Sequence, residues 1–412
     1  MSSHAASNKL IHLASLSMTK IGDGLVDPKL VLSWALNTAG APQAAIGLLV
    51  PLRESLAMLP QILEAAWLQG INRRKFVWAA GSAVQGLSVA GMALVLSLLE
   101  GAVAGWSVVG LVVVFALGRS LASVSYKDVL GRTVDKGSRG SVTGYAGSVA
   151  SVFVLLFGAG LSFGVIPLTL TSVIIAICMA AGAWCVASGL FMLLREGAGD
   201  EEEAGQAPAG VRDVVALLIE DRQLQRFTLA RFLMSATALA PPFILSAAHG
   251  DGSAPGSQLG SLGPFVLASS IASILGSSAW GVASDRSSRR VMIYAALLAA
   301  VVLGAMAAVL LSAGQQIELP VLETSIALFV LMMAYQGVRR GRSTHIVDMA
   351  PQDQKSSYAA VSNTVVGLLL LGGGVLGVIA DVFGLAVVFV LLAVMCVAGA
   401  MVAFGLEDVQ ST

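Results

Sequence analysis

The sequence has little charge for its length. Only 12% of its 412 residues are Asp, Glu, Lys or Arg, about half the roughly 25% of typical soluble domains. This composition excludes an ordinary soluble enzyme, whose surface needs more charged side chains. The 24 basic and 24 acidic residues balance to a formal net charge of zero, which gives no overall field that would attract nucleic acid. We therefore expect no nucleic-acid partner.

Cysteine is scarce as well. Cys178, Cys185 and Cys396 lie inside apolar runs without disulfide or metal-ligand spacing, so we interpret them as small packing residues. The chain has no Walker sequence, no zinc-type His/Cys spacing and no nucleophile elbow. These absences argue against an ATP-driven pump, a metal site, a bound cofactor and a hydrolase. Because Met1 to Lys20 is polar, we expect no removed signal peptide.

Long apolar runs, by contrast, are plentiful, and 56% of the residues are hydrophobic. A transmembrane helix needs about 20 largely apolar residues, whereas spanning strands show short alternating segments. Continuous runs such as Val291 to Leu311 therefore predict helices. The twelve expected spans are Met18 to Ala39, Ala45 to Leu68, Phe76 to Leu99, Ala104 to Tyr126, Ser141 to Phe163, Ile166 to Leu194, Phe227 to Ala248, Leu262 to Ala283, Val291 to Ser312, Val321 to Val338, Tyr358 to Ile379 and Phe383 to Phe404.

Basic residues divide the predicted loops into two classes. Loops that follow even-numbered spans contain Arg73, Arg74, Lys75, Lys127, Arg132, Lys136, Arg139, Arg195, Arg212, Arg222, Arg226, Arg286, Arg289, Arg290, Arg339, Arg340, Arg342 and Lys355. Loops that follow odd-numbered spans contain none. Because Lys and Arg accumulate in cytoplasmic loops, we predict a multi-pass protein of the inner cell membrane with both termini in the cytoplasm.

The longest internal loop begins with the acidic, Gly- and Ala-rich segment 197–210, whose composition cannot form a core. We predict a cytoplasmic linker over 196–226, between an N-terminal six-helix bundle over 1–195 and a C-terminal one over 227–412. Apolar residues then recur at helical spacing and predict a short amphipathic helix on the inner membrane surface. These residues are Val211, Val214, Val215, Leu218 and Ile219.

The two halves share a pattern of charged residues. Arg119 and Asp128 are nine residues apart at the end of the fourth span, and Arg339 and Asp348 repeat this spacing at the end of the tenth. The Arg73 pair after the second span likewise corresponds to a basic pair after the eighth. Two homologous halves, related by an axis along the membrane normal, explain both repeats. The predicted fold is therefore all-α, with twelve transmembrane helices in two six-helix pseudo-symmetric bundles.

One loop segment carries a family resemblance. The segment Gly281-Val-Ala-Ser-Asp-Arg-Ser-Ser-Arg-Arg290 resembles the signature G-x-x-x-D-R-x-G-R-R of the major facilitator superfamily, with Ser288 in place of the later glycine. The equivalent first-half segment ends in Arg73 and Arg74 but has Gln69 where the family has an acid. The resemblance implies two bundles that rock about a central site, which opens to one side of the membrane at a time.

The resemblance also implies a gate at the inner end of the bundle interface. Asp285 is expected near the start of the fifth span, around Ser141, where unpaired N–H groups favour an anion. Arg286 and the basic pair Arg289 and Arg290 would bind helix-end carbonyls or lipid phosphates. An alternative is that the basic pair only orients the protein in the bilayer.

Arg119 also resembles the family's gate residues at the inner end of the fourth span. Asp128 or Asp348 is its expected partner.

Several charged residues fall inside spans, where each costs about 2.5 to 3.5 kcal/mol unless it faces a cavity or a partner. In the first span, Asp23 and Asp27 are one turn apart and share a face. Two close carboxylates in a dry cleft cannot both ionise comfortably, so one is expected to carry a proton. Lys29 can pair with Asp27 only if Pro28 distorts the helix. Alternatively, Asp23 lies harmlessly among the inner headgroups.

The second span carries Arg53 and Glu54, at about the depth of Lys29. We expect Arg53 to meet Asp27 or an anionic substrate, and Glu54 to meet Lys29. A purely structural buried network is the alternative. In the seventh span, Arg231 either binds a substrate carboxylate or extends to the membrane surface.

These features predict a secondary transporter that moves a small organic solute by alternating access, with proton coupling at Asp23 or Asp27. Its expected partners are the solute, protons and the lipid bilayer, and we expect it to act as a monomer. Two alternatives remain. One is an uncoupled facilitator or exchanger of an ionic metabolite. The other is a non-transporting membrane assembly or lipid-handling protein with the same fold.

Overall fold

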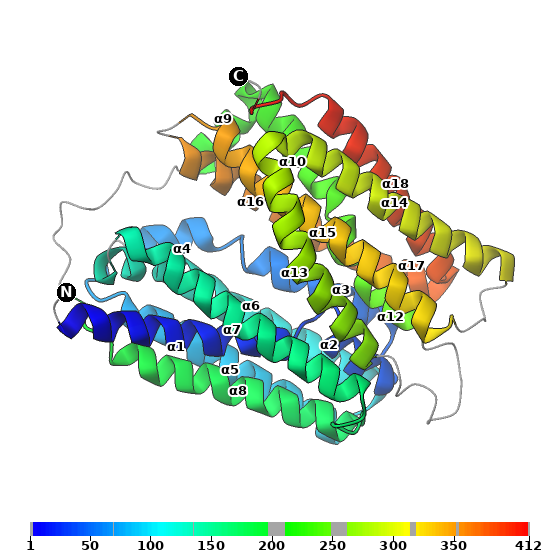
Figure 1. Ribbon diagram of the computed structural model, residues 1–412, viewed down its shortest axis with the longest axis horizontal. Helices are drawn as coiled ribbons and strands as arrows, with labels where there is room; N and C mark the ends of the chain where they lie inside the picture. The colour runs from blue at the N-terminus through cyan, green and yellow to red at the C-terminus, as the bar shows by residue number, and fades with distance from the viewer. Residues whose placement is uncertain are drawn as a thin grey trace.

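The structure, a computed structural model, is helical throughout the part of the chain that it describes (Figure 1). The described residues are 3–68, 70–134, 136–196, 211–248, 262–313, 319–351 and 354–410. Gln69 and the acidic part of the predicted linker, 197–210, lie outside these ranges.

Ten stretches of the described residues are long and apolar enough to cross a membrane on their own. The first two predicted spans complete the twelve, and each of them is divided between two helices. The helices of the first half are α1 (Ser3–Leu25), α2 (Val31–Thr38), α3 (Gln43–Leu56), α4 (Gln61–Leu68), α5 (Lys75–Leu98), α6 (Gly101–Thr133), α7 (Lys136–Ser162) and α8 (Leu170–Met192).

The second half begins with a short helix that precedes its first span. The helices are α9 (Val211–Glu220), α10 (Arg222–Met234), α11 (Ala236–Leu239), α12 (Pro241–Ala247), α13 (Leu262–Arg286), α14 (Ser288–Ala313), α15 (Val321–Met349), α16 (Lys355–Leu371), the 3-10 turn η3 (Gly372–Gly374), α17 (Val375–Phe383) and α18 (Leu385–Phe404). The predicted amphipathic helix is therefore present as α9. Its Leu218 packs against α16, but Ile219, which we placed on the same apolar face, is exposed.

Three helices extend well beyond their predicted spans. α1 begins at Ser3 instead of Met18, α6 continues past Tyr126 to Thr133, and α15 continues past Val338 to Met349. At 1.5 Å per residue, the 33 residues of α6 reach about 50 Å, whereas the hydrocarbon core is about 30 Å thick. Hydropathy detects only the apolar part of a helix, so our placement of the polar ends in loops was wrong.

The two halves form two groups of helices that converge at one end (Figure 1). We call this the opposite end; it carries the turns at Gly40 and Gly384. The other end, which we call the basic end, carries Arg74, which directly precedes α5, and Arg289, in the first turn of α14.

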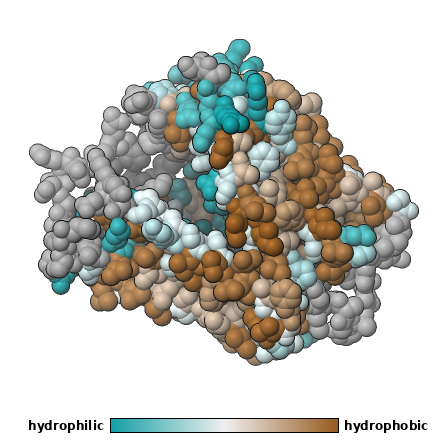
Figure 2. All heavy atoms as spheres, viewed as in Figure 1, coloured by the Kyte–Doolittle hydropathy of each residue, from teal (hydrophilic) through white to brown (hydrophobic). Residues whose placement is uncertain are grey.

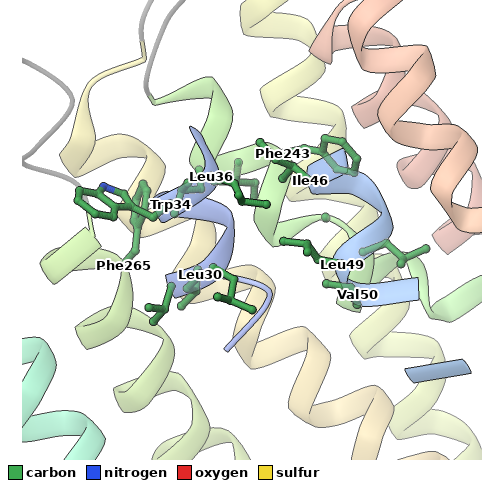
Figure 3. Packing of buried hydrophobic residues seen from close by; sticks show 14 of the residues in the cluster. Leu30, Trp34, Leu36, Ile46, Leu49, Val50, Phe243 and Phe265 are labelled. Carbon is green, nitrogen blue, oxygen red and sulfur yellow. The ribbon is translucent and has the colours of Figure 1, made fainter. Parts of the chain in front are cut away.

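Large apolar side chains from both halves pack together near the opposite end (Figure 3). Trp34 of α2 and Ile46 of α3 come from the first half, and Phe243 of α12 and Phe265 of α13 come from the second. All four are buried. Burial of such side chains contributes roughly 1.5–3 kcal/mol each in water, and here it closes the space between the halves.

Candidate functional site

An acid of the second half binds the start of a helix in the first half at the opposite end. The Asp381 carboxylate accepts the backbone N–H groups of Gln43 and Ala44, at 3.0 and 2.8 Å. These residues begin α3, where the N–H groups lack helical partners and the helix dipole favours negative charge. We did not predict a role for Asp381 from the sequence. Its position beside the turn at Gly384 was the only available signal.

A second polar contact joins the halves beside it. The Asn37 side-chain amide donates to Ser246 Oγ at 3.1 Å, and the Gln43 amide donates to Asn37 Oδ1 at 3.0 Å. Ser246 Oγ also lies 3.0 Å from Gln43 Oε1. α2, α3 and α12 are therefore connected in one network.

Glycines allow the backbones of the two halves to approach closely at this end. A Cβ built on Gly47 of α3 would lie 2.7 Å from Gly377 Cα of α17. A Cβ on Gly263 of α13 would lie 2.7 Å from the backbone N of Ser162 in α7. Real Cβ atoms do not come this close, so glycine is required at both crossings.

The same two helices, α7 and α13, separate toward the basic end. A Cβ on Gly140, Gly144 or Gly281 would meet no described heavy atom within 4 Å. Asp285 is exposed, and it forms no ion pair or hydrogen bond with the described residues. The predicted contact between Asp285 and the start of α7, near Ser141, is therefore not formed here. Such a contact requires the basic end to be closed.

A cavity of about 370 Å³ lies between the halves, and Figure 2 shows a hollow with hydrophilic side chains between them. α1, α6 and α7 line it from the first half, and α13 and α15 from the second. Its charged lining residues are Lys20, Asp23, Asp27, Arg119 and Arg339.

Asp23 is the centre of the ion pairs in this cavity. Its Oδ1 lies 2.7 Å from Arg53 Nη2 and 2.5 Å from Arg119 Nη1. Two of our predicted pairings were thus wrong. Arg53 pairs with Asp23 and not with Asp27. Arg119 pairs with neither predicted acid, because Asp128 is nine residues further along α6, about 13 Å toward the basic end. The alternative that Asp23 lies among lipid headgroups does not account for these two ion pairs.

Asp27 and Lys29 flank the break between α1 and α2. Pro28 lacks a backbone N–H group, and the Asp27 carboxylate instead accepts the N–H of Lys29 at 3.0 Å. The carboxylate lines the cavity and makes no ion pair with any described residue.

The side chains of Lys29 and Glu54 do not form the pair that we predicted. Lys29 Nζ lies 4.0 Å from the ring centroid of Tyr335 in α15, across the interface. Glu54 Oε1 lies 4.0 Å from Arg53 Nη1 instead.

Arg231 of α10 is buried against α16. Its guanidinium donates to Ser362 Oγ at 2.9 Å and to Asn363 Oδ1 at 2.8 Å. Only 7% of the residue is exposed, so it does not extend to the membrane surface as our alternative proposed.

The remaining gate candidates contact residues of their own half. Asp128 pairs with Arg74. Arg289 and Arg290 lie 3.7 and 4.0 Å from Asp408, and Arg289 also donates to the carbonyl of Leu406 at 2.9 Å. Arg289 thus binds a carbonyl just beyond the end of α18, within its own half, and its role in the gate stays a prediction.

The acids that follow the last span of each half hold the start of that half's third span. Glu196, after α8, accepts the N–H groups of Arg74 and Lys75 at the start of α5, at 3.2 and 2.9 Å. After α18, Asp408 accepts the Ser287 hydroxyl. Asp348, at the end of α15, accepts the Gln410 amide at 2.7 Å. We did not predict Glu196 or Asp408, although the repeat, searched for acids after each half, would have indicated them.

Comparison with known proteins reveals likeness in fold only. No protein-family model and no curated protein matches the chain in sequence. Solved structures match over nearly the whole length. The nucleoside transporter NupG is 12% identical, covering 98% of each chain with a TM-score of 0.70. A POT family transporter in complex with 5-aminolevulinic acid is 10% identical, covering 96% of this chain and 95% of its own, with a TM-score of 0.71. A D-xylose–proton symporter is 12% identical over 100% of both chains, with a TM-score of 0.66.

Proposed function

We propose that this chain, which has the fold of the major facilitator superfamily transporters, is a secondary transporter of a small organic solute. The observation that carries the proposal is a charged cavity between two groups of helices, which meet at the opposite end and separate at the basic end. Such a cavity can exchange solute with one side of a membrane only. In the proposed cycle, the halves rock until the basic end closes and the opposite end opens.

The positive residues of the basic end favour a cytoplasmic location for it. The structure would then represent the inward-facing state of a protein in the inner cell membrane. The proposed division of the chain places one rocking unit in 1–195 and the other in 227–412, joined by the linker 196–226. Asp285 and Arg286 would contact the start of α7 in the outward-facing state.

We assign proton binding to Asp27 and the positioning of two cations to Asp23. At Asp23, a proton must compete with Arg53 and Arg119, both on one carboxylate oxygen. Asp27 faces the same cavity without an ion pair among the described residues. Its protonation therefore breaks no salt bridge, which suits a group that must gain and lose a proton in each cycle.

The test uses purified full-length protein in liposomes that contain a pH-sensitive dye. Solutes of several classes, including carboxylates, sugars and nucleosides, are added outside under an imposed pH gradient. We expect at least one solute to drive proton movement. Asp27→Asn should abolish the proton movement, since the amide side chain of asparagine does not take up a proton near neutral pH.

Glu323→Gln is the matched control, because Glu323 is an exposed carboxylate at the start of α15. It should leave both solute and proton movement unchanged. Solute uptake that ignores the pH gradient and is unchanged in Asp27→Asn would favour the uncoupled facilitator or exchanger. Absence of any solute movement, with a lipid or protein partner retained through purification, would favour the non-transporting alternative.

A further inference from the structure

Two cations that are more than nine-tenths buried lie at the interface between the halves without a carboxylate within ion-pair distance. They are Arg231 of α10 and Lys29 between α1 and α2, which are both 7% exposed. Neither forms a salt bridge with any of the described residues. Arg53 and Arg119, by contrast, both reach Asp23. An uncompensated buried charge is costly, so it normally has a ligand or a function.

Arg231 retains free binding capacity. Its contacts to Ser362 and Asn363 use one hydrogen bond from each terminal nitrogen, and both acceptors are neutral. Its Nε is buried and has no hydrogen-bond partner among the residues that the structure describes. Nη2 also lies 4.0 Å from Met58 Sδ, where the first half faces this side chain. The guanidinium is therefore fixed in orientation at the interface but not neutralised.

Lys29 is the buried cation of the other half. Its ammonium group lies over the ring of Tyr335, which contributes to the wall of a small cavity together with Glu54, Arg339 and Arg342. A cation over an aromatic ring is stabilised only partly in comparison with an ion pair.

Glu54 is the acid whose charge acts on both Lys29 and Arg231. It is also engaged by Arg53. Asp27 also acts on Lys29, so two carboxylates, Glu54 and Asp27, face the three cations Lys29, Arg53 and Arg231, which still leaves an excess of positive charge.

The excess extends over the whole interface. The cations that line the two cavities or lie buried beside them are Lys20, Lys29, Arg53, Arg119, Arg231, Arg339 and Arg342, and the acids are Asp23, Asp27 and Glu54. A neutral or cationic solute would leave this excess in place. A solute with a negatively charged oxygen group would reduce it and could accept hydrogen bonds from Arg231.

We propose that the transported solute is an anion whose carboxylate or phosphate group binds Arg231, with Lys29 as the second cation of the site. The claim that the solute is transported rests on the proposed function, whereas the claim that an anion binds Arg231 does not. Tyr335 and Glu54 then limit the space beside the anionic group, and Ser362 and Asn363 orient the guanidinium.

The experiment measures binding alone, in detergent and without a membrane gradient. The melting temperature of the full chain is followed while formate, acetate, benzoate, succinate or inorganic phosphate is added at constant ionic strength. Formamide, acetamide, benzamide and succinamide serve as neutral counterparts. We expect at least one anion to raise the melting temperature and its amide not to do so, because a bound ligand stabilises the folded state.

Arg231→Gln should weaken that anion's binding about tenfold or more, in line with the strength of hydrogen bonds between charged groups. Arg231→Lys should retain part of it. The matched control is Arg222→Gln, an exposed arginine at the start of the same helix, which should bind as the unchanged protein does. If Arg231→Gln does not fold, Arg231→Lys and Lys29→Gln provide the test, and both should weaken binding.

Three outcomes would overturn the inference: no anion stabilises the protein, the amides stabilise it as strongly, or binding is the same in all variants. A phosphate response without a carboxylate response would instead identify the anionic group as phosphate. Because transport is not measured, solute movement in liposomes could still support the proposed function if anion binding failed. Anion binding without solute movement would support this inference and contradict the proposed function.

Discussion

The two ends of the interface between the halves differ in how their polar groups are satisfied. At the opposite end, the groups bind across the interface, as Asp381 does to the start of α3. At the basic end, Glu196, Asp128 and Arg289 bind within their own half. The basic end can therefore open without leaving these groups unpaired. Opening of the opposite end must break contacts between the halves.

The contacts of the opposite end also differ in expected strength. A carboxylate at an exposed helix start contributes about 0.3–1 kcal/mol, whereas a disturbed close contact in a packed interface costs about 1–3 kcal/mol. The glycine crossings should therefore determine which end is open, and the polar contacts should adjust the balance. The four predictions below test this ranking.

The largest effect is expected from Gly377→Ala. The added Cβ would overlap the carbonyl O of Gln43 and lie 2.9 Å from Ala44 Cα. Separation of α3 from α17 should shift the balance toward an open opposite end by about 1–3 kcal/mol, or roughly 5- to 150-fold. Spin labels attached without cysteine at positions 103 and 322 would measure this as a longer distance across the opposite end.

Gly182→Ala is the control, since a Cβ there would meet nothing described within 4 Å. It should leave the distance between the labels unchanged. An unchanged distance in Gly377→Ala itself would show that the crossing does not hold this end closed.

Glu196→Gln should lower stability without changing which end is open. The side chain of Glu196 is 0% exposed, and it accepts two backbone N–H groups of its own half. Loss of its charge should lower the free energy of unfolding by about 1–2 kcal/mol. Thermal or denaturant unfolding measures the loss, with the exposed Glu220→Gln as control. A change in the distance between labels at positions 73 and 340, across the basic end, would contradict the comparison.

Asp381→Asn should have a smaller effect, confined to the balance between the two states. An amide still accepts a hydrogen bond but loses the interaction of a full charge with the start of α3. A shift of about 0.3–1 kcal/mol toward the open opposite end is expected, or up to roughly fivefold. The labels at 103 and 322 report it, and high salt should reduce it.

Glu100→Gln is the control for this variant. Glu100 precedes α6 and makes no side-chain capping bond to it. A shift in Glu100→Gln equal to that in Asp381→Asn would indicate a general charge effect instead of a specific contact.

Asp285→Asn should change the present state least. Because Asp285 is exposed and makes no ion pair or hydrogen bond with the described residues, both label distances and the melting temperature should stay the same. Solute transport should slow by up to roughly fivefold, since the proposed contact with α7 forms only when the basic end closes. Unaltered transport would remove Asp285 from the gate.

Residue types and their spacing predicted much of the fold but less of the site. Runs of apolar residues predicted the spans, and the basic residues predicted which loops lie at the same end of the molecule. Asp23 and Asp27 were recognised as unusual because charge is rare at that depth. The partners of Asp23 were not, since Arg53 and Arg119 come from two other helices, and a long guanidinium side chain can reach an acid one turn away from the expected one. Asp381 resembled an ordinary surface acid until α3 was placed beside it.

The sequence by itself determined that the chain spans a membrane many times in two related halves, because helix length and the cost of buried charge are local properties. It also indicated which charges needed either a cavity or a partner. Only the tertiary structure decided which end of the interface is closed, which acid binds the arginines, and which cations stay uncompensated. These properties depend on distances between helices that are far apart in the chain, and no local pattern fixes such distances.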